Sequence, residues 1–281
     1  MKKLKRFAAV FLAFVIVASV YLYWGNNSIT VTEYAVSPAN LPKSFDGFRI
    51  VHVSDLHNKD FGEKLTDKII AAKPDIIVIT GDIIDSYHTD IPVAADFAES
   101  VSKIAPVYYV TGNHENRIAE YSILRTEMES MGITVLDGKT VDFERDGGTI
   151  ALSGIDDLTF FNGSMINENR TEFAENLRSI AAETGENASI LLSHRPELLD
   201  IYAETGFDVV FCGHAHGGQI RLPFVGGLFC PDQGFFPEYT KGVHTKDNTN
   251  MIVSRGLGNS IFPLRVFNRP ELVVCELRME K

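Results

Sequence analysis

The chain contains the sequence Gly213-His214-Ala215-His216-Gly217-Gly218-Gln219 directly after the apolar run Asp208-Val209-Val210-Phe211-Cys212. Two imidazoles therefore stand one residue apart at the end of a predicted strand. Successive strand side chains point to opposite faces, so we expect both imidazoles on one side of the backbone. Gly213 and Gly217 permit a tight turn around a bound ion, because glycine adopts backbone angles that other residues avoid. The pair predicts a metal site.

Four more predicted strands end in a polar cluster of the same kind. The apolar runs cover residues 50–54, 76–80, 107–111 and 189–193. They lead, in this order, to Asp55-Leu56-His57, Gly81-Asp82, Gly112-Asn113-His114-Glu115 and His194. Ligands of α/β sheets bind at the carboxyl ends of strands, so we expect these side chains to converge. Five strand ends then supply enough oxygen and nitrogen donors for two metal ions.

Amphipathic stretches alternate with the strands, and this predicts βαβ units around a largely parallel sheet. The stretches with helical apolar spacing are residues 61–72, 91–103, 117–131, 168–183 and 196–204. Two strand-rich regions with glycine turns, residues 133–155 and 219–281, depart from the alternation. They predict a second sheet packed on the first.

The composition narrows the class of protein. The 281 residues, 45% hydrophobic and 22% charged, suit one large globular domain or two small ones. A net charge of −11 gives no general attraction to phosphate backbones, so no nucleic-acid partner is expected. The three cysteines lack CxxC spacing, which argues against a disulfide framework or a zinc ribbon.

The N-terminus is typical of a membrane anchor. Residues 1–6 are basic and residues 7–24 carry no charge. A helix of that length spans roughly 27 Å, about the thickness of a bilayer core. The preceding cations predict a cytoplasmic N-terminus, and Tyr21, Tyr23 and Trp24 predict an aromatic belt at the far interface. We expect a single-pass protein of the cell membrane with its catalytic domain outside the cytoplasm. The alternative is a cleaved signal peptide and a secreted protein, although no small-residue cleavage site precedes Tyr21.

The five motifs in this order resemble those of the calcineurin-like metallophosphoesterase superfamily. The resemblance runs from about Phe48 to the C-terminus and implies a four-layer α/β/β/α sandwich over residues 48–281. A membrane segment (7–24) and a linker with the first strand (25–47) would precede it. The form Gly-His-Ala-His-Gly-Gly-Gln and the tail from Ser254-Arg255-Gly256 to Arg269-Pro270-Glu271-Leu272 resemble the membrane-associated bacterial phosphodiesterase branch. That branch includes enzymes similar to UDP-2,3-diacylglucosamine pyrophosphatases.

The resemblance implies a centre of two divalent metal ions. It implies that Asp55, His57 and His216 hold one metal, that Asn113, His194 and His214 hold the other, and that Asp82 bridges both. Carboxylates and imidazoles without a thiolate suit Mn²⁺, Fe or Zn²⁺ better than Ca²⁺, and manganese is the first choice. Two such ions share a bridging hydroxide, which attacks the phosphorus, and they clamp the phosphoryl oxygens.

Two further residues have expected catalytic roles. His114, which is not a ligand in the family pattern, would protonate the leaving oxygen or stabilise its developing charge. Asp85 would orient this imidazole and raise its pKa. Three arginines could neutralise substrate phosphate, with surface ion pairs as the alternative: Arg195, Arg255 and Arg265. Several phenylalanines are interpreted as core or loop anchors, with a lipid-facing role as the alternative: Phe160, Phe161, Phe224, Phe229, Phe235 and Phe236.

The expected function is metal-dependent hydrolysis of a phosphodiester or pyrophosphate bond, with a lipid or cell-envelope precursor as the expected substrate. The alternatives are a phosphomonoesterase or phosphoprotein phosphatase, a nuclease of the same superfamily, and a metal-binding scaffold without catalysis. The sequence predicts no oligomeric state.

Overall fold

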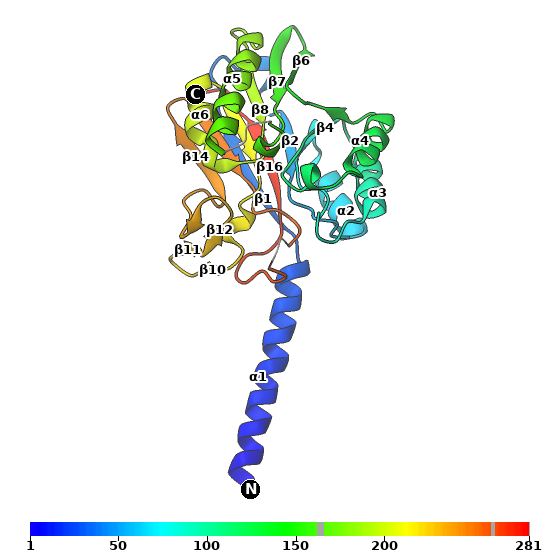
Figure 1. The fold of residues 1–281 in the computed structure, drawn as a ribbon, viewed down its shortest axis with the longest axis vertical. Helices are drawn as coiled ribbons and strands as arrows, with labels where there is room; N and C mark the ends of the chain where they lie inside the picture. The colour runs from blue at the N-terminus through cyan, green and yellow to red at the C-terminus, as the bar shows by residue number, and fades with distance from the viewer. Residues whose placement is uncertain (162–165, 260–261, 281) are drawn as a thin grey trace.

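The computed structural model of this chain describes residues 1–161, 166–259 and 262–280 (Figure 1). Two six-stranded sheets of mixed direction form its centre. The first sheet has the order β1-β16-β2-β3-β4-β5. Its strands are β1 (Thr30–Val36), β16 (Glu271–Leu277), β2 (Arg49–Val53), β3 (Ile76–Thr80), β4 (Val107–Val110) and β5 (Thr134–Val135). Strands β2 to β5 are parallel, as the alternation with helices predicts.

The second sheet has the order β14-β15-β9-β8-β7-β6. It confirms that another sheet is present, but the expected division of the strands is partly wrong, because β8 and β9 belong to the second sheet and β16 to the first. Its strands are β14 (Gly242–Lys246), β15 (Thr249–Val253), β9 (Val209–Cys212), β8 (Ala188–Leu192), β7 (Gly148–Gly154) and β6 (Lys139–Arg145). Strands β15, β9, β8 and β7 are parallel, and the two edge strands are antiparallel to their neighbours.

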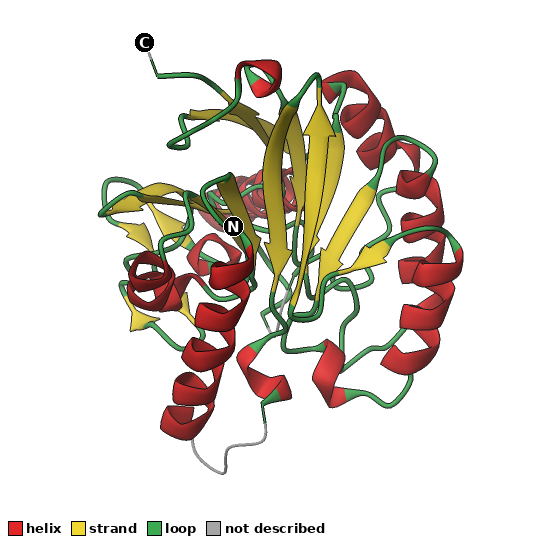
Figure 2. Cartoon of the chain, turned by 90° about the horizontal axis from the view of Figure 1, so that it is seen from above, coloured by secondary structure: helices red, strands yellow, loops and turns green. Residues whose placement is uncertain are grey.

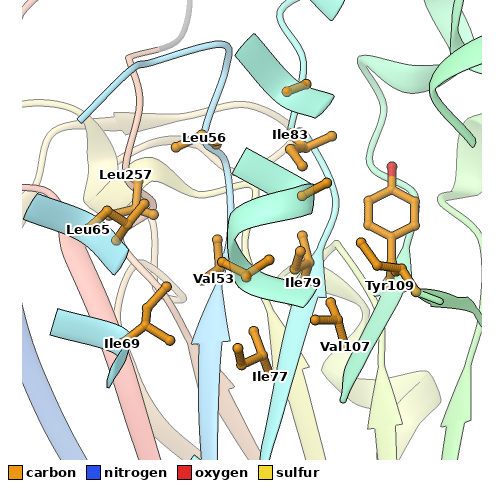
Figure 3. Packing of buried hydrophobic residues seen from close by; sticks show 14 of the residues in the cluster. Val53, Leu56, Leu65, Ile69, Ile77, Ile79, Ile83, Val107, Tyr109 and Leu257 are labelled. Atoms are coloured by element: carbon orange, nitrogen blue, oxygen red, sulfur yellow. The ribbon is translucent and has the colours of Figure 1, made fainter. Parts of the chain in front are cut away.

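Helices cover the outer faces of the two sheets (Figure 2). The first sheet packs against α2 (Glu63–Ala72), α3 (Ile91–Ser102) and α4 (Tyr121–Ser130), and the second against α5 (Ile166–Glu183) and α6 (Leu199–Thr205). Figure 3 shows Leu65 and Ile69 of α2 on the strand residues of the first sheet. The layers are therefore helices, sheet, sheet and helices, which is the predicted four-layer sandwich.

Period-two alternation in the strands builds the core between the sheets. In β9, Val209 and Phe211 face the other sheet, whereas Val210 and Cys212 face the helices. Strand β2 alternates in the same way. Its His52 lies between the sheets, where the centroid of its ring is 5.2 Å from that of the Phe211 ring. Each fully buried apolar side chain of this kind contributes about 1.5–3 kcal/mol to folding.

The helix α1 (Lys2–Asn27) precedes the sandwich and is long and apolar enough to cross a membrane. It extends beyond the predicted segment 7–24 and includes residues 25–27, which were expected to belong to the linker. Asn26 is buried at its end and bonds to Arg265, accepting from the backbone N–H at 2.8 Å and donating to the carbonyl oxygen at 3.1 Å. The end of α1 is therefore fixed to the domain.

Two predicted helices begin later than their apolar spacing suggests. The stretch from residue 117 starts its α-helix only at Tyr121, because a 3₁₀ turn, Glu115–Arg117, comes first. A second 3₁₀ turn, Pro196–Leu198, precedes α6. Beyond Gln219 the chain first forms two small hairpins outside the second sheet: β10 (Arg221–Leu222) with β11 (Gly226–Gly227), and β12 (Phe229–Cys230) with β13 (Gly234–Phe235).

The inter-sheet core predicts a large effect of Phe211→Ala. Removing this fully buried ring should lower the free energy of unfolding by about 3–5 kcal/mol, because a cavity remains between the sheets. The matched control is Phe224→Ala. The side chain of Phe224 is fully exposed, so this substitution should change the free energy of unfolding by no more than about 0.5 kcal/mol. Urea unfolding in detergent measures both, and equal losses would contradict the packing described here.

Candidate metal centre

The seven residues predicted as metal ligands lie just beyond the carboxyl ends of five strands. Strands β2, β3 and β4 of the first sheet and β8 and β9 of the second all end at this point. The structure brings the seven side chains together there. They are Asp55, His57, Asp82, Asn113, His194, His214 and His216, and all of them are buried.

The backbone in this region is mostly left-handed. Five of the seven residues have a positive φ: Asp55 (52°), His57 (48°), Asp82 (51°), His214 (62°) and His216 (47°). Residues other than glycine seldom adopt such angles, and they cluster at functional sites where the surrounding structure enforces them. The strand alternation expected for His214 and His216 is therefore wrong. Both follow the end of β9, and the left-handed turn, not the strand pleat, directs them.

Glycines allow the strand ends to approach one another closely. A Cβ atom at Gly213 would lie 1.8 Å from Ser54 Oγ, and one at Gly81 would lie 2.2 Å from the backbone nitrogen of Gly112. Neither position has room for a side chain. Gly213 thus lets the loop after β9 touch the loop after β2. Gly81 does the same for the loops after β3 and β4.

The buried acids and imidazoles form two clusters that share Asp82. One contains Asp55, His57, Asp82 and His216, and the other contains Asp82, His194 and His214, and each could hold a metal ion. Asp82 Oδ2 lies 3.6 Å from His57 Nε2 and 3.3 Å from His194 Nε2. Its other oxygen accepts the backbone N–H of His114 at 2.8 Å. The carboxylate of Asp82 thus stands between the two clusters.

Hydrogen bonds fix the orientation of two imidazoles in the second cluster. His194 Nδ1 lies 2.7 Å from the carbonyl oxygen of Thr80, and His214 Nε2 lies 3.0 Å from Asp232 Oδ2. Carbonyl and carboxylate oxygens only accept, so each of these nitrogens carries the proton. The remaining nitrogens, His194 Nε2 and His214 Nδ1, lie 3.2 Å apart, and a bound cation would replace the proton between them. Metal-binding histidines are commonly held in this way.

The electrostatics of the centre favour a cation. Burial lowers the pKa of His57 to about 3, so its imidazole is neutral and able to coordinate. Burial also opposes protonation of His194, but Asp82 and Asp55 outweigh it and raise the pKa to about 10. The carboxylates that hold a proton on His194 exert the same attraction on a metal ion.

The side chain of Asn113 gives independent evidence that these residues suit a bound cation. Its Oδ1 is buried and has no hydrogen-bond partner within the described part of the chain. A buried carbonyl oxygen without a partner is unfavourable unless something not yet counted satisfies it. Amide oxygens are metal ligands, so the donor set of this centre fits a bound cation.

His114 stands beside the centre, with its ring centroid 4.5 Å from that of His57. The backbone N–H of Ser86 donates to His114 Nδ1 at 3.0 Å, whereas Asp85 Oδ1 lies 3.7 Å from the same nitrogen. Asp85 therefore does not hydrogen-bond the ring directly. Burial lowers the pKa of His114, although Asp82 and Asp85 act in the opposite direction.

Glu115 has a role that the sequence did not indicate. Its buried carboxylate accepts three backbone N–H groups, from Asp82 at 3.0 Å, Ile83 at 2.9 Å and Gly112 at 2.7 Å. Burial, followed by the charge of Asp82, raises its pKa to about 8. The only sequence signal for this role was its position in Gly-Asn-His-Glu. Hydrogen bonds to backbone N–H groups cannot be inferred from residue types. Glu115 joins the loops that carry Asp82 and Asn113.

The three arginines considered for phosphate binding differ in position. Arg265 is buried and donates to the carbonyl oxygens of Gly258 and Arg255. Both predictions for this residue, a surface ion pair and a contact with substrate phosphate, are therefore wrong. Arg255 pairs with Glu271 at 2.9 Å.

Arg195 pairs with Asp157 and with Asp232, each at 2.6 Å. Asp157 both caps a 3₁₀ turn and holds this guanidinium. Asp232 was missed, because only the fold brings the β12–β13 hairpin next to His214.

An open cavity of about 180 Å³ gives access to the centre. Its wall includes Asp82, Asn113, His114, His214 and His216 from the centre, and Tyr87, Arg117, Arg195, Pro231 and Asp232 from the surroundings. Two guanidinium groups thus face the space in front of the buried acids. Guanidinium matches the geometry of phosphate oxygens, so the cavity suits an anionic ligand.

Comparison with known proteins gives consistent matches. A sequence model of calcineurin-like phosphoesterases matches residues 48–218. The Bacillus subtilis protein called uncharacterized metallophosphoesterase YkuE is 31% identical over 268 residues, covering 91% of this chain and 88% of that protein. Phosphodiesterase YaeI of Escherichia coli is 26% identical over 238 residues, covering 82% of each. Among solved structures, TT1561 of Thermus thermophilus aligns with a TM-score of 0.51 at 13% identity, over 75% of this chain and 90% of that one, which shows a shared fold.

The contacts of Glu115 predict a specific defect in Glu115→Gln. The amide has one acceptor oxygen and an NH₂ group, so it cannot accept all three N–H groups, and the loops of Asp82 and Asn113 should loosen. We expect metal affinity to fall by about 10–100-fold, as for other supports of metal ligands. Equilibrium dialysis with Mn²⁺ measures the loss. The matched control is the exposed Glu120→Gln, and equal affinity in the two variants would contradict the role given to Glu115.

Proposed function

The chain belongs to the calcineurin-like phosphoesterase family, metal-dependent hydrolases of phosphoester bonds, and we propose that it cleaves a phosphodiester or pyrophosphate bond at a centre of two divalent metal ions. The observation that carries this proposal is the pair of buried clusters that share Asp82. A carboxylate with a cluster on each side is the arrangement that a bridging ligand requires.

The proposed ligands follow the two clusters. Asp55, His57 and His216 would hold one ion, Asn113, His194 and His214 the other, and Asp82 both. Oxygen and imidazole donors without a thiolate favour Mn²⁺ as the resident ion, with Fe or Zn²⁺ as alternatives. When bound, the two ions supply an activated water as nucleophile and neutralise charge on the phosphoryl oxygens.

His114 is the proposed catalytic residue outside the metal ligands. A backbone N–H can only donate, so the contact from Ser86 makes His114 Nδ1 an acceptor and leaves the proton of the neutral ring on Nε2. The side chain lines the cavity and can donate this proton in a hydrogen bond to the leaving oxygen as charge develops. Stabilisation of that charge is therefore favoured over full protonation.

Asp85 is proposed to position His114 through the backbone. Its Oδ1 accepts the N–H of Tyr87 at 2.8 Å, which closes a turn around Ser86. That turn presents the Ser86 N–H to His114. Arg117, on the cavity wall, is proposed to bind the non-bridging oxygens of the substrate phosphate. Arg195, whose guanidinium is held by Asp157 and Asp232, is proposed to add positive charge to the same wall.

The proposed substrate is a lipid or cell-envelope molecule, and the proposed location is the cell membrane with the domain outside the cytoplasm. The apolar helix α1 and its aromatic end support the anchor. The contacts of the buried Asn26 favour retention of the end of α1, because cleavage beyond this residue would leave the backbone groups of Arg265 without their partner. A relative called phosphodiesterase supports the bond type, and the net charge of −11 disfavours a nuclease.

Metal-restored hydrolysis of simple esters tests the proposed reaction. The full chain in detergent is stripped of metal and titrated with Mn²⁺, Fe²⁺, Zn²⁺ or Mg²⁺ in the presence of an aryl phosphodiester or the matching monoester. We expect activity only with added metal and a preference for the diester. Preference for the monoester would favour a phosphatase, and two bound ions without turnover would favour a scaffold.

The role of His114 predicts a separable defect in His114→Ala. Turnover should fall by roughly 10²–10⁴, most for substrates with poor leaving groups, because the donor to the leaving oxygen is lost. Metal content should stay unchanged. The matched control is His88→Ala, an exposed histidine two residues beyond Ser86. Equal loss for good and poor leaving groups would remove His114 from the step at the leaving oxygen.

A further inference from the structure

Three exposed phenylalanines have left-handed backbones, Phe224, Phe236 and Phe267, and the first and last of them line one hollow. Phe224 has a φ of 67° and is fully exposed, and Phe267 has a φ of 50° and is 59% exposed. A bulky side chain is unfavourable in the left-handed region, where asparagine or glycine is common. Water is also an unfavourable environment for these rings. A partner outside the described part of the chain would remove these rings from water.

The two rings belong to one apolar surface, which we call the α1-side patch. It consists of Leu222, Phe224, Val225 and Phe267, all exposed, which surround a common hollow. Leu222 to Val225 form the turn between β10 and β11, at the same end of the domain as α1 (Figure 1). Phe267 also contacts the ring of Tyr21 in α1, with centroids 5.6 Å apart. The patch is therefore continuous with the apolar helix.

Cations gather around the end of α1. A hollow of about 440 Å³ is lined by Lys64, Lys68 and Arg269 together with Tyr23 and Trp24. The described residues on its wall include no carboxylate, although the chain carries a net charge of −11. The Arg269 guanidinium stands 4.6 Å from the centre of the Trp24 ring. Cations and aromatic rings in one place are typical of a surface that meets anionic lipid headgroups.

We propose that the α1-side patch docks on the membrane that α1 enters. Phe224 and its neighbours in the β10–β11 turn enter the boundary between headgroups and acyl chains, and the cations around the end of α1 contact anionic headgroups. The inference rests on the proposed role of α1 as a membrane anchor, and it adds a second, non-covalent attachment. This gives Phe224 the lipid-facing role that the sequence left as an alternative.

Docking would fix the metal centre relative to the bilayer. The β10–β11 hairpin continues directly into the β12–β13 hairpin, whose Pro231 and Asp232 line the cavity of the centre. A turn held in the interface would therefore hold one wall of the cavity near the headgroups. The substrate class favoured by this arrangement is an amphiphile whose phosphate stays at the bilayer surface.

Depth-dependent fluorescence quenching tests the docking without relying on catalysis. The three native cysteines are buried, so an introduced thiol reacts selectively with a fluorophore. The full chain carries Val225→Cys in the turn, Val20→Cys in α1, or Glu144→Cys on β6 near the β6–β7 turn, which lies at the far end of the domain from α1 (Figure 1). Each is reconstituted in vesicles of phosphatidylcholine and phosphatidylglycerol that contain a nitroxide-labelled lipid.

We expect quenching at positions 20 and 225 and none at position 144. Quenching at position 20 alone would overturn the docking and leave the anchor in place. No quenching at position 20 would overturn the anchor, and with it the docking. A change at position 225 that follows protein density and not the quencher lipid would show a second copy of the chain on the patch, which also overturns the proposal.

Phe224→Asn separates docking from folding. Asparagine accepts a left-handed backbone better than phenylalanine, so the thermal unfolding midpoint in detergent should stay unchanged or rise. In vesicles, quenching at the position 225 label should fall toward the level at position 144. A lower unfolding midpoint would show that Phe224 serves the fold, and undiminished quenching would show that it does not enter the interface. Either result overturns its role.

Discussion

The buried carboxylate of Asp82 is the constraint on which the rest of the site depends. A charged group that is fully buried between two sheets needs partners on every side. One oxygen receives the His114 backbone N–H, and the other faces His57 and His194 across 3.6 and 3.3 Å. Burial alone would raise the pKa of Asp82, but the charge of His194 and its hydrogen bond to Asp82 outweigh it and hold the pKa well below its ordinary value. The same concentration of negative charge, with Asp55 close by, favours divalent cations.

The four-layer fold supplies that environment because it brings strand ends from two sheets to one point. Each sheet delivers part of the donor set, and glycines at 81 and 213 let the loops touch. Supporting groups then fix the donors: Glu115 ties two loops of the first sheet, and Asp232 and the Thr80 carbonyl orient imidazoles of the second. The centre is thus built on rigid elements, with a cavity open on one side for the substrate.

Much of this could be predicted from the sequence, because strand ends and their polar clusters are local signals. The presence of two sheets, five helices near their predicted ranges and the convergence of Asp55, Asp82 and His194 follow from periodicity and order. The left-handed turn over His214 and His216 could not be predicted, since His214 donates to Asp55 and His216 accepts from Asn268, both distant in the sequence. The contacts of Asp232 and of Asn26 at the end of α1 could not be predicted for the same reason. Their partners are 18 and 239 residues away.

Anomalous X-ray scattering from crystals of the protein grown with Mn²⁺ tests the central claim most directly. The account predicts two peaks per chain about 3.5–4 Å apart, one among Asp55, His57 and His216, the other among Asn113, His194 and His214, with Asp82 between them. A single ion, or two ions of which neither touches Asp82, would contradict it.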